Sequence, residues 1–374
     1  MGLARTQKVK WLSRGARLGA AALTLALSTA LAADAVQRQP PQKLSDTGLY
    51  GDAVARTIAA DVRPYSPQYP LGSDGAEKLR WVSLPKNRTI DVKDGDAWRF
   101  PAGTRFWKQF SFGGRRVETR YIEKTGEKTG KDAWLFATYV WDESQREATL
   151  APAATGLKNH VAIAPGVRHD VPSVSDCKAC HEGIGRDSVL GYGALQLSSD
   201  RDPLAPHAEP APAGGLDLDA LLKEHRLRNA PESWRTAAPV IAASSSRARA
   251  ALGYLHANCG FCHNDRDPVS SVGLALGANC AAVCMADQPT MRTAVGVRSK
   301  FQIRGVLPDH SLRLAPGDIE SSAVLVRMRS RDGLSQMPPL GSKLVDAAAF
   351  ELISNWVRDG LPSTAVPNGP AHNP

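Results

Sequence analysis

The clearest pattern along the chain is an alternation of apolar and polar residues on either side of a glycine pair. Residues 106–112 and 115–122 have the aromatic and β-branched side chains and the period of two that are typical of strands, and Gly113-Gly114 separates them. Glycine at both central positions favours a two-residue turn of the primed type, so we predict a β-hairpin. Residues 133–141 predict a further strand. Together they indicate a small antiparallel β domain, a sandwich or a partly closed barrel, over residues 76–165.

Helical spacing replaces this alternation in the last third of the chain. Three serines at 244–246 can cap a helix over residues 247–256. Asp346 is a good N-cap for a second helix, which Gly360 ends. Residues 319–329 also follow a helical pattern.

The remaining segments carry weaker patterns. Residues 46–60 predict a short helix within an N-terminal segment, 33–75, whose proline-rich part must be extended. We expect this segment to wrap along the surface of the domains after it. Residues 151–175 have the composition of a linker, and residues 216–227 predict a short helix in an otherwise loop-rich region, 166–243.

The N-terminus has the features of a secretory signal peptide. Five basic residues precede an apolar run at 18–27, and Ala30-Leu31-Ala32 is a small-x-small cleavage site. The apolar run is too short to span about 30 Å of hydrocarbon comfortably, which argues against the alternative of a membrane anchor. We therefore predict a signal peptide over residues 1–32, removal after Ala32, and a periplasmic or otherwise exported protein.

Removal of this leader changes the charge of the chain. The formal net charge of +9 falls to +4, because the leader holds five basic and no acidic residues. No basic run with interleaved aromatic residues occurs, so we predict no nucleic-acid partner. Residues 363–374 are expected to form a disordered tail.

Two Cys-x-x-Cys-His pentapeptides carry the chemistry. They are Cys177-Lys178-Ala179-Cys180-His181 and Cys259-Gly260-Phe261-Cys262-His263, and they use four of the six cysteines. This is the signature of covalent attachment of a c-type haem. Two thiols at this spacing can form thioethers with the two vinyl groups of a porphyrin, and the adjacent imidazole can bind the iron. The sequence therefore predicts two covalent haems, with His181 and His263 as proximal ligands.

Other uses of the two cysteine pairs fit less well. A thioredoxin-like redox pair needs a βαβ context, whereas a helix is predicted before Cys259. Four-thiolate zinc sites usually have about 15–20 residues between pairs, but here Cys180 and Cys259 are 79 residues apart and each pair carries its own histidine. Two disulfides would not explain those histidines.

A methionine is the expected sixth ligand at the second site. Met337, in Gln336-Met337-Pro338-Pro339, lies 74 residues after His263, and its thioether sulfur suits haem iron opposite an imidazole. Met328 is the competing candidate, but it falls in the helical run, where a side chain is more often part of the core. The long interval implies an insertion, in which Cys280 and Cys284 are expected to form a local disulfide, with two thiols as the alternative.

The sixth ligand of the first site is left open by the sequence, because no methionine occurs between His181 and His256. The candidates are His160, His169, His207 and His225, or the position could be empty.

One helix before a haem attachment site and one at the chain end, crossing each other, is the arrangement of class I cytochromes c. We therefore expect an α+β fold: an N-terminal antiparallel β domain, a loop-rich first haem module over 166–243, and an all-α class I cytochrome c-like domain over 244–362.

Several further segments carry a resemblance to a known family. They are 65–67, 71–75, 98–104, 118–120, 139–141, 190–192 and 255–259, that is YSP, LGSDG, WRFPAGT, ETR, YVW, LGY and LHANC. With both pentapeptides, the chain resembles bacterial periplasmic dihaem c-type cytochromes with an N-terminal β-rich region. The likeness covers nearly all of the mature chain except the insertion with Cys280 and Cys284. It implies two covalent haems and a redox role.

The leading hypothesis is thus electron transfer between redox protein partners, not catalysis. A dihaem peroxidase with an open iron at the first haem is the main alternative, although that family does not need the β-rich stretch ahead of it. A cytochrome subunit of a dehydrogenase and a haem-based sensor are further alternatives; no kinase-like, cyclase-like or DNA-binding segment supports the sensor.

Overall fold

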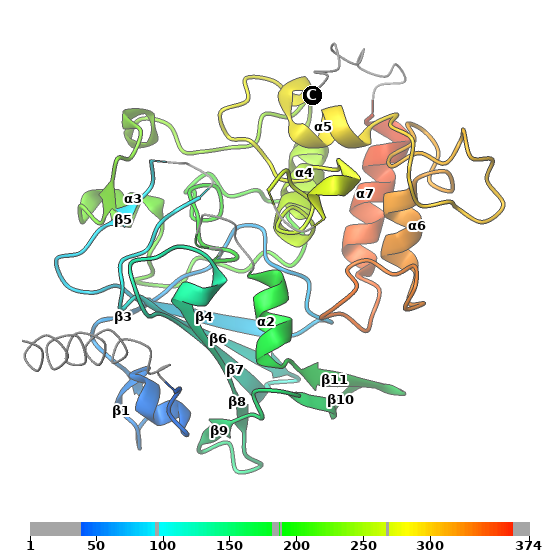
Figure 1. Cartoon of the computed structure of the whole chain (residues 1–374). Helices are drawn as coiled ribbons and strands as arrows, with labels where there is room; N and C mark the ends of the chain where they lie inside the picture. Colours follow the sequence, from blue (N-terminus) through cyan, green and yellow to red (C-terminus); the bar gives the residue numbers. More distant parts are fainter. Residues whose placement is uncertain (1–38, 94–96, 182–186, 188, 267–268, 362–374) are drawn as a thin grey trace, which may run out of the picture. The chain divides into compact units, whose positions relative to one another are not determined.

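Six antiparallel strands form the largest element of the structure, a computed structural model that describes residues 39–93, 97–181, 187, 189–266 and 269–361. The strands lie in the order β3 (Val62–Pro64), β4 (Glu77–Ser83), β6 (Arg105–Phe112), β7 (Arg115–Lys124), β8 (Trp134–Trp141) and β9 (Ala148–Leu150) (Figure 1). The predicted hairpin is confirmed as β6 and β7, joined by Gly113 and Gly114 with φ of 55° and 73°. The strand predicted at 133–141 is β8. The predicted signal peptide and tail lie outside the described residues.

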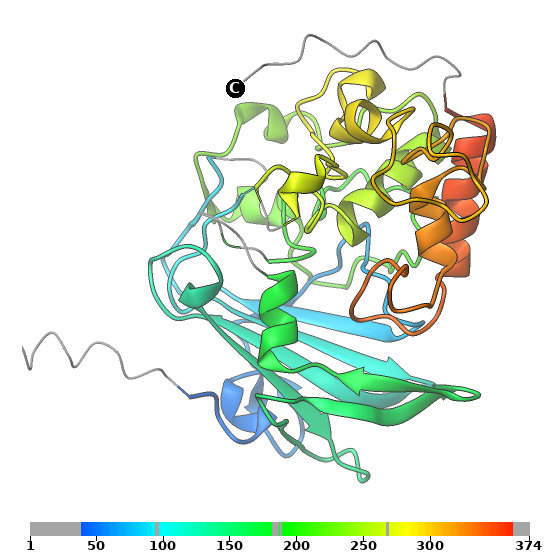
Figure 2. The same ribbon diagram turned by 45° about the vertical axis from the view of Figure 1, so that its right-hand side comes forward.

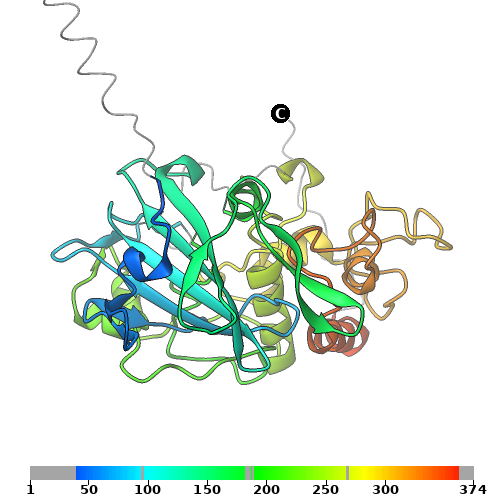
Figure 3. The same ribbon diagram turned by 90° about the horizontal axis from the view of Figure 1, so that it is seen from below.

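One face of this sheet packs against the N-terminal segment. Trp107, Tyr121 and Tyr139 form a core there with Leu44 and Leu49. The segment is not the helix predicted at 46–60. It consists of a 3-10 turn, η2 (Leu44–Thr47), and two short paired strands, β1 (Tyr50–Asp52) and β2 (Thr57–Ile58) (Figure 3). The prediction failed because Gly48 takes a left-handed conformation, with φ of 84°, and ends the helical turn.

The opposite face carries side chains in rows across the strands. Val82, Phe106, Ile122 and Phe136 are direct neighbours in the register and form an apolar row. This row belongs to a second core with Tyr65, Phe100, Tyr192 and residues of α3 (Leu218–Lys223). Helix α2 (Val174–Cys180) lies over β8 on this face (Figure 2).

The segment expected to be a linker is folded. Within 151–175, β10 (Leu157–Ala164) and β11 (Val167–Val171) form a hairpin that leads into α2. No side chain of β10 is fully buried, so the alternation of polar and apolar residues along it is too weak to predict a strand. The short helix predicted in 216–227 is confirmed as α3, capped by Asp217.

Both helices predicted in the last third are confirmed and pack on each other (Figure 1). They are α4 (Ser246–Asn258), capped by Ser245, and α7 (Ala347–Asp359), capped by Asp346. The helical run at 319–329 begins later than expected, as α6 (Ala323–Arg329). Other short elements are α5 (Pro289–Ala294), the parallel pair β5 (Ile90–Asp91) and β12 (Leu227–Arg228), and the 3-10 turns η3 (Lys131–Ala133), η4 (Glu232–Arg235), η5 (Ser270–Val272) and η6 (Met285–Asp287).

The expected fold class is wrong. The six-stranded sheet dominates the described part of the chain, and no all-α domain of the class I cytochrome type is found there. The reason lies in the core around α4 and α7. It is closed by Tyr69 from the N-terminal segment and by Leu195 and Ile241 from loops, so these helices do not bury their apolar faces on one another alone. By its contacts, Pro40–Pro374 is one compact unit.

The proline-rich part of the N-terminal segment runs through this interior. It contains no helix, as predicted, but residues 65–70 are buried rather than laid on the surface. Tyr65 belongs to the core on the sheet and Tyr69 to the core around α4, so the segment joins the two.

Candidate functional site

The second Cys-x-x-Cys-His sequence forms a tight turn at the end of α4. The backbone N–H of Cys259 donates to the carbonyl of Leu255, and those of Cys262 and His263 donate to the carbonyl of Cys259, at 2.9 to 3.1 Å. Asn258 ties the turn to the N-terminal segment, because its Oδ1 accepts from the N–H of Gly72 at 2.7 Å. The two thiol-bearing residues and His263 are thereby placed in the wall of one cavity.

His263 is the most distinctive group in this wall. Burial, together with the charges of Arg327 and Arg313, lowers the pKa of its imidazole, so the ring is neutral and can offer a nitrogen lone pair. Its Nδ1 is buried and has no hydrogen-bond partner among the described residues. A neutral, buried imidazole beside two thiols has the chemistry of a proximal haem ligand.

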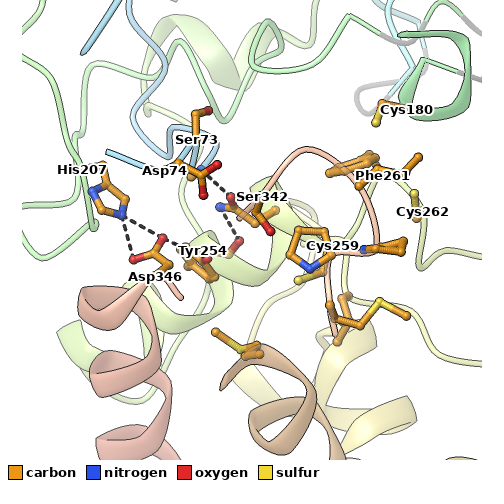
Figure 4. Close-up of a pocket in the computed structure, with 18 of the residues that line it drawn as sticks. Ser73, Asp74, Cys180, His207, Tyr254, Cys259, Phe261, Cys262, Ser342 and Asp346 are labelled. Carbon is orange, nitrogen blue, oxygen red and sulfur yellow. Dashed lines mark hydrogen bonds and ion pairs between the residues drawn. The ribbon is translucent and has the colours of Figure 1, made fainter. Parts of the chain in front are cut away.

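Both candidate methionines line the same cavity. Met328 lies on α6 and contributes to the core around α4, whereas Met337 lies on a loop. The loop is held at its start by a bond from the Met337 N–H to the carbonyl of Arg327, at 2.9 Å. Farther along, the carboxylate of Asp74 accepts from the N–H groups of Lys343 and Leu344 at 2.9 to 3.0 Å. Asp74 therefore ties the methionine loop to the N-terminal segment (Figure 4).

The first Cys-x-x-Cys-His sequence lies on the sheet. Ser173 and Asp176 form a capping box that starts α2, which places Cys177 and Cys180 one turn apart. His181 ends the helix, and its ring centroid lies 5.4 Å from that of Phe136 on β8. Cys177 packs against the core on the sheet, while Cys180 lines the cavity that also contains Cys259 and Cys262.

This shared cavity has a volume of about 1340 Å³. Small-molecule pockets are typically about 300–1,000 Å³, so there is room for a large group or for parts of two. Figure 4 shows Cys180 on the side of Phe261 and Cys262, with His207 and Asp346 at the opposite side of the view. The space, the thiols and the buried imidazole fit a covalently attached haem at the second pair, and Cys180 brings the first pair to the same space.

The four candidate histidines for the first site are dispersed. His207 lines the cavity away from Cys180 in Figure 4, and its Nε2 lies 2.8 Å from a carboxylate oxygen of Asp346. His169 is buried, with its Nε2 3.3 Å from Oε1 of Glu118. His160 is half-buried on β10, and His225 is exposed.

The thiols are poor candidates for the redox or zinc alternatives. Burial raises the pKa of Cys177 to about 11 and that of Cys259 to about 12, which disfavours the thiolate that a redox pair uses. Within the described residues, no three Cys, His, Asp or Glu side chains converge to hold a metal ion. The expected disulfide between Cys280 and Cys284 is absent from the structure; the Cys284 thiol donates to Asp287 instead, at 3.3 Å.

Sequence reasoning missed a group of cations on the sheet. Lys78 and Arg80 on β4 line the cavity, and Lys108 on β6 and Arg120 on β7 follow in register with Arg80. The alternation of each strand could have shown which residues share a face. The pairing of β4 with β6, however, could not be predicted, because no local pattern in the sequence shows that these two segments lie side by side.

No family model, curated protein or solved structure matches the chain. Across the part of the chain that the structure covers, no helix has both the length and the apolar character needed to span a membrane.

Proposed function

We propose that the chain is an exported dihaem c-type cytochrome that transfers electrons between redox partners and is not itself an enzyme. One observation carries the proposal: Cys180 of the first pentapeptide and Cys259, Cys262 and His263 of the second line a single cavity. Two redox groups attached at these positions would share one space, and edge-to-edge proximity is what electron transfer requires.

The residues have distinct roles in this proposal. Cys177, Cys180, Cys259 and Cys262 anchor two porphyrins, and His181 and His263 bind the irons. Met337 completes the second site, because it lies on a loop tied at both ends, whereas Met328 is committed to the core. The cofactor supplies an iron that changes oxidation state by one electron. Leu274 and Leu276, which are buried and pack in the same core as Cys259, give the cavity an apolar wall there.

The test is the mass and the haem content of the mature protein, purified from a bacterium with a c-type haem attachment system. We expect two covalent haems per chain. The double substitution of Cys177 and Cys180 by serine should leave one haem, and so should that of Cys259 and Cys262. The matched control, in which Cys280 and Cys284 are replaced by serine, should keep two. A parent protein with no covalent haem would refute the proposal.

A further inference from the structure

A row of cations crosses the sheet on the face that carries the first pentapeptide. Arg80 on β4, Lys108 on β6 and Arg120 on β7 are direct cross-strand neighbours. Opposite residues in such a register have Cβ atoms about 4.5–5.5 Å apart, and like charges so placed destabilise a sheet. Lys78 extends the group by one pleat on β4. Such a concentration of positive charge calls for a compensating anion.

The carboxylates of the chain compensate this charge only in part. Glu209 pairs with one nitrogen of Arg80, and Glu118 accepts from Arg120 at 2.6 Å. The second nitrogen, Nη2 of Arg80, is buried and has no partner in the described part of the chain, although the residue is only 4% exposed and lines the cavity. An unsatisfied buried donor on a charged group is costly, so this atom points to a missing acceptor.

Lys108 and Lys78 show the same deficit. The Lys108 ammonium has no recorded carboxylate partner among the described residues and instead lies 4.8 Å from the ring centroid of Phe110. Burial, followed by the charges of Arg80, Lys78 and Arg120, holds its pKa well below the usual range. Burial and the charge of Arg80 lower the pKa of Lys78 to about 8, and its Nζ donates to the carbonyl of Leu71. A bound anion would reverse these shifts.

We propose that Arg80 and Lys108, flanked by Lys78, form a carboxylate-binding subsite for the haem anchored at Cys177 and Cys180. This inference rests on the proposed function. Cys180 lines the same cavity as Lys78 and Arg80, so the row borders the space that this anchoring residue reaches. Arg80 lies two strands away from Arg120, about 9.6 Å at the usual strand spacing. A porphyrin carries its carboxylates on the side opposite its vinyl groups, and the unpaired Nη2 of Arg80 can donate a charge-assisted hydrogen bond to one of them.

The test is the reduction potential of each haem in the mature holoprotein with Arg80→Gln and with Lys108→Met. A positive charge near a haem favours the reduced state. Loss of one charge about 10 Å away should shift the ratio of reduced to oxidised first haem about tenfold toward the oxidised form, or about 59 mV. The second haem should move much less. Arg115→Gln is the matched control, because Arg115 is exposed on the same sheet and its side chain bonds, within the described residues, only to the carbonyl of Glu143.

Two further measurements keep the proposal falsifiable. The first haem in Arg80→Lys should have a reduction potential close to that of the parent protein, because the positive charge is kept. This variant replaces Arg80→Gln in the comparison if Arg80→Gln folds poorly. Identical first-haem potentials in Arg80→Gln, Lys108→Met and Arg115→Gln would overturn the subsite, although two covalent haems would leave the proposed function standing. Calorimetric titration with succinate and phosphate separates the two sources of anion. We expect no binding to the holoprotein; binding that Arg80→Gln abolishes would show that the subsite takes a free anion, and would overturn the haem assignment.

Discussion

Asp346 joins the last helix to the wall of the cavity, and replacing it tests whether the fold depends on that junction. Its Oδ1 accepts from the N–H of Ala349 and caps α7. Its Oδ2 accepts from the hydroxyl of the buried Tyr254 at 3.1 Å, and His207 Nε2 lies 2.8 Å away. One carboxylate therefore connects α7, α4 and the loop that carries His207.

The cost of Asp346→Ala can be estimated from these three contacts. Loss of an N-cap costs about 1 kcal/mol. A hydrogen bond to a charged group contributes about 1.5 kcal/mol at the low end of its range, and its loss leaves the Tyr254 hydroxyl without that partner. The His207 side chain is 34% exposed, so solvent screens that pair and we assign it about 0.5 kcal/mol. We expect the free energy of unfolding to fall by about 3 kcal/mol.

Asp217→Ala is the matched control. Asp217 caps α3 through one bond to the N–H of Ala220, at 2.7 Å, and has no other recorded side-chain bond in the described residues. Its replacement should cost only about 1 kcal/mol. Urea unfolding of both holoprotein variants, followed by far-ultraviolet circular dichroism, gives the comparison. Equal losses in the two variants would refute the reasoning, because the cap would then account for the whole effect of Asp346.

The contribution of Asp346 to stability should also depend on pH, which the comparison of the parent protein with Asp346→Ala can test. Burial opposes ionisation of Asp346, but the bonds from His207, Ala349 and Tyr254 outweigh it and hold the pKa below its ordinary value. The stabilisation is therefore complete above the unfolded-state pKa of about 3.9 and is lost as pH falls through the lower folded-state pKa. The difference in unfolding free energy between parent and Asp346→Ala should shrink as pH falls below about 4. A difference that persists at low pH would contradict this account.

Two further pairs of substitutions test the site and its core. Met337→Ala should remove the magnetic circular dichroism signature of sulfur ligation and lower the potential of the second haem, whereas Met328→Ala should keep the signature and cost about 2–5 kcal/mol of core packing; the opposite result would make Met328 the ligand. Gly253→Ala should destabilise the protein by about 1–3 kcal/mol despite the helix preference of alanine, because a Cβ there would lie 2.1 Å from the Tyr69 ring. Gly277→Ala has open space and should change urea stability by less than about 0.5 kcal/mol; similar losses at both glycines would count against the close packing of Tyr69.

The elements that the sequence predicts correctly are those with a clear local pattern. The glycine pair at 113–114 and the alternation around it define β6 and β7, and the caps Ser245 and Asp346 define the starts of α4 and α7. Each signal is contained within about a dozen residues. The helix expected at 46–60 fails on a local detail as well, the left-handed Gly48.

The fold class and the cavity depend on contacts between distant segments, which no local pattern contains. The pattern of α4 and α7 does not show that Tyr69 and Ile241 complete their core, so it suggests a self-contained helical domain. Nor does it show that Asn258, next to Cys259, binds the backbone of Gly72. The pentapeptides predict the haem-attachment residues, but only tertiary structure brings Cys180 and Cys259 to one cavity.

The environment of the first pentapeptide offers a test between an electron carrier and a peroxidase. Peroxide reduction needs an open iron and a group beside it that gives and takes a proton near the working pH. Glu118 is the carboxylate whose charge acts on the Cys177 thiol together with that of Asp176, and Glu118 lies on the sheet face under α2. Burial alone would raise the pKa of Glu118, but the charge of Arg120 and the hydrogen bond with His169 hold it below its ordinary value.

A carboxylate with a lowered pKa holds no proton to donate near neutral pH. We therefore expect the reduced protein to be oxidised rapidly by ferricyanide and only slowly by hydrogen peroxide in stopped-flow mixing, with no saturation. Glu118→Gln should leave the slow peroxide rate unchanged, because the carboxylate takes no part in it. Saturable turnover in the parent that Glu118→Gln abolishes would instead make Glu118, whose Oε2 is buried without a hydrogen-bond partner in the described residues, a proton-transfer group. That result would refute the electron-carrier hypothesis in favour of an enzyme.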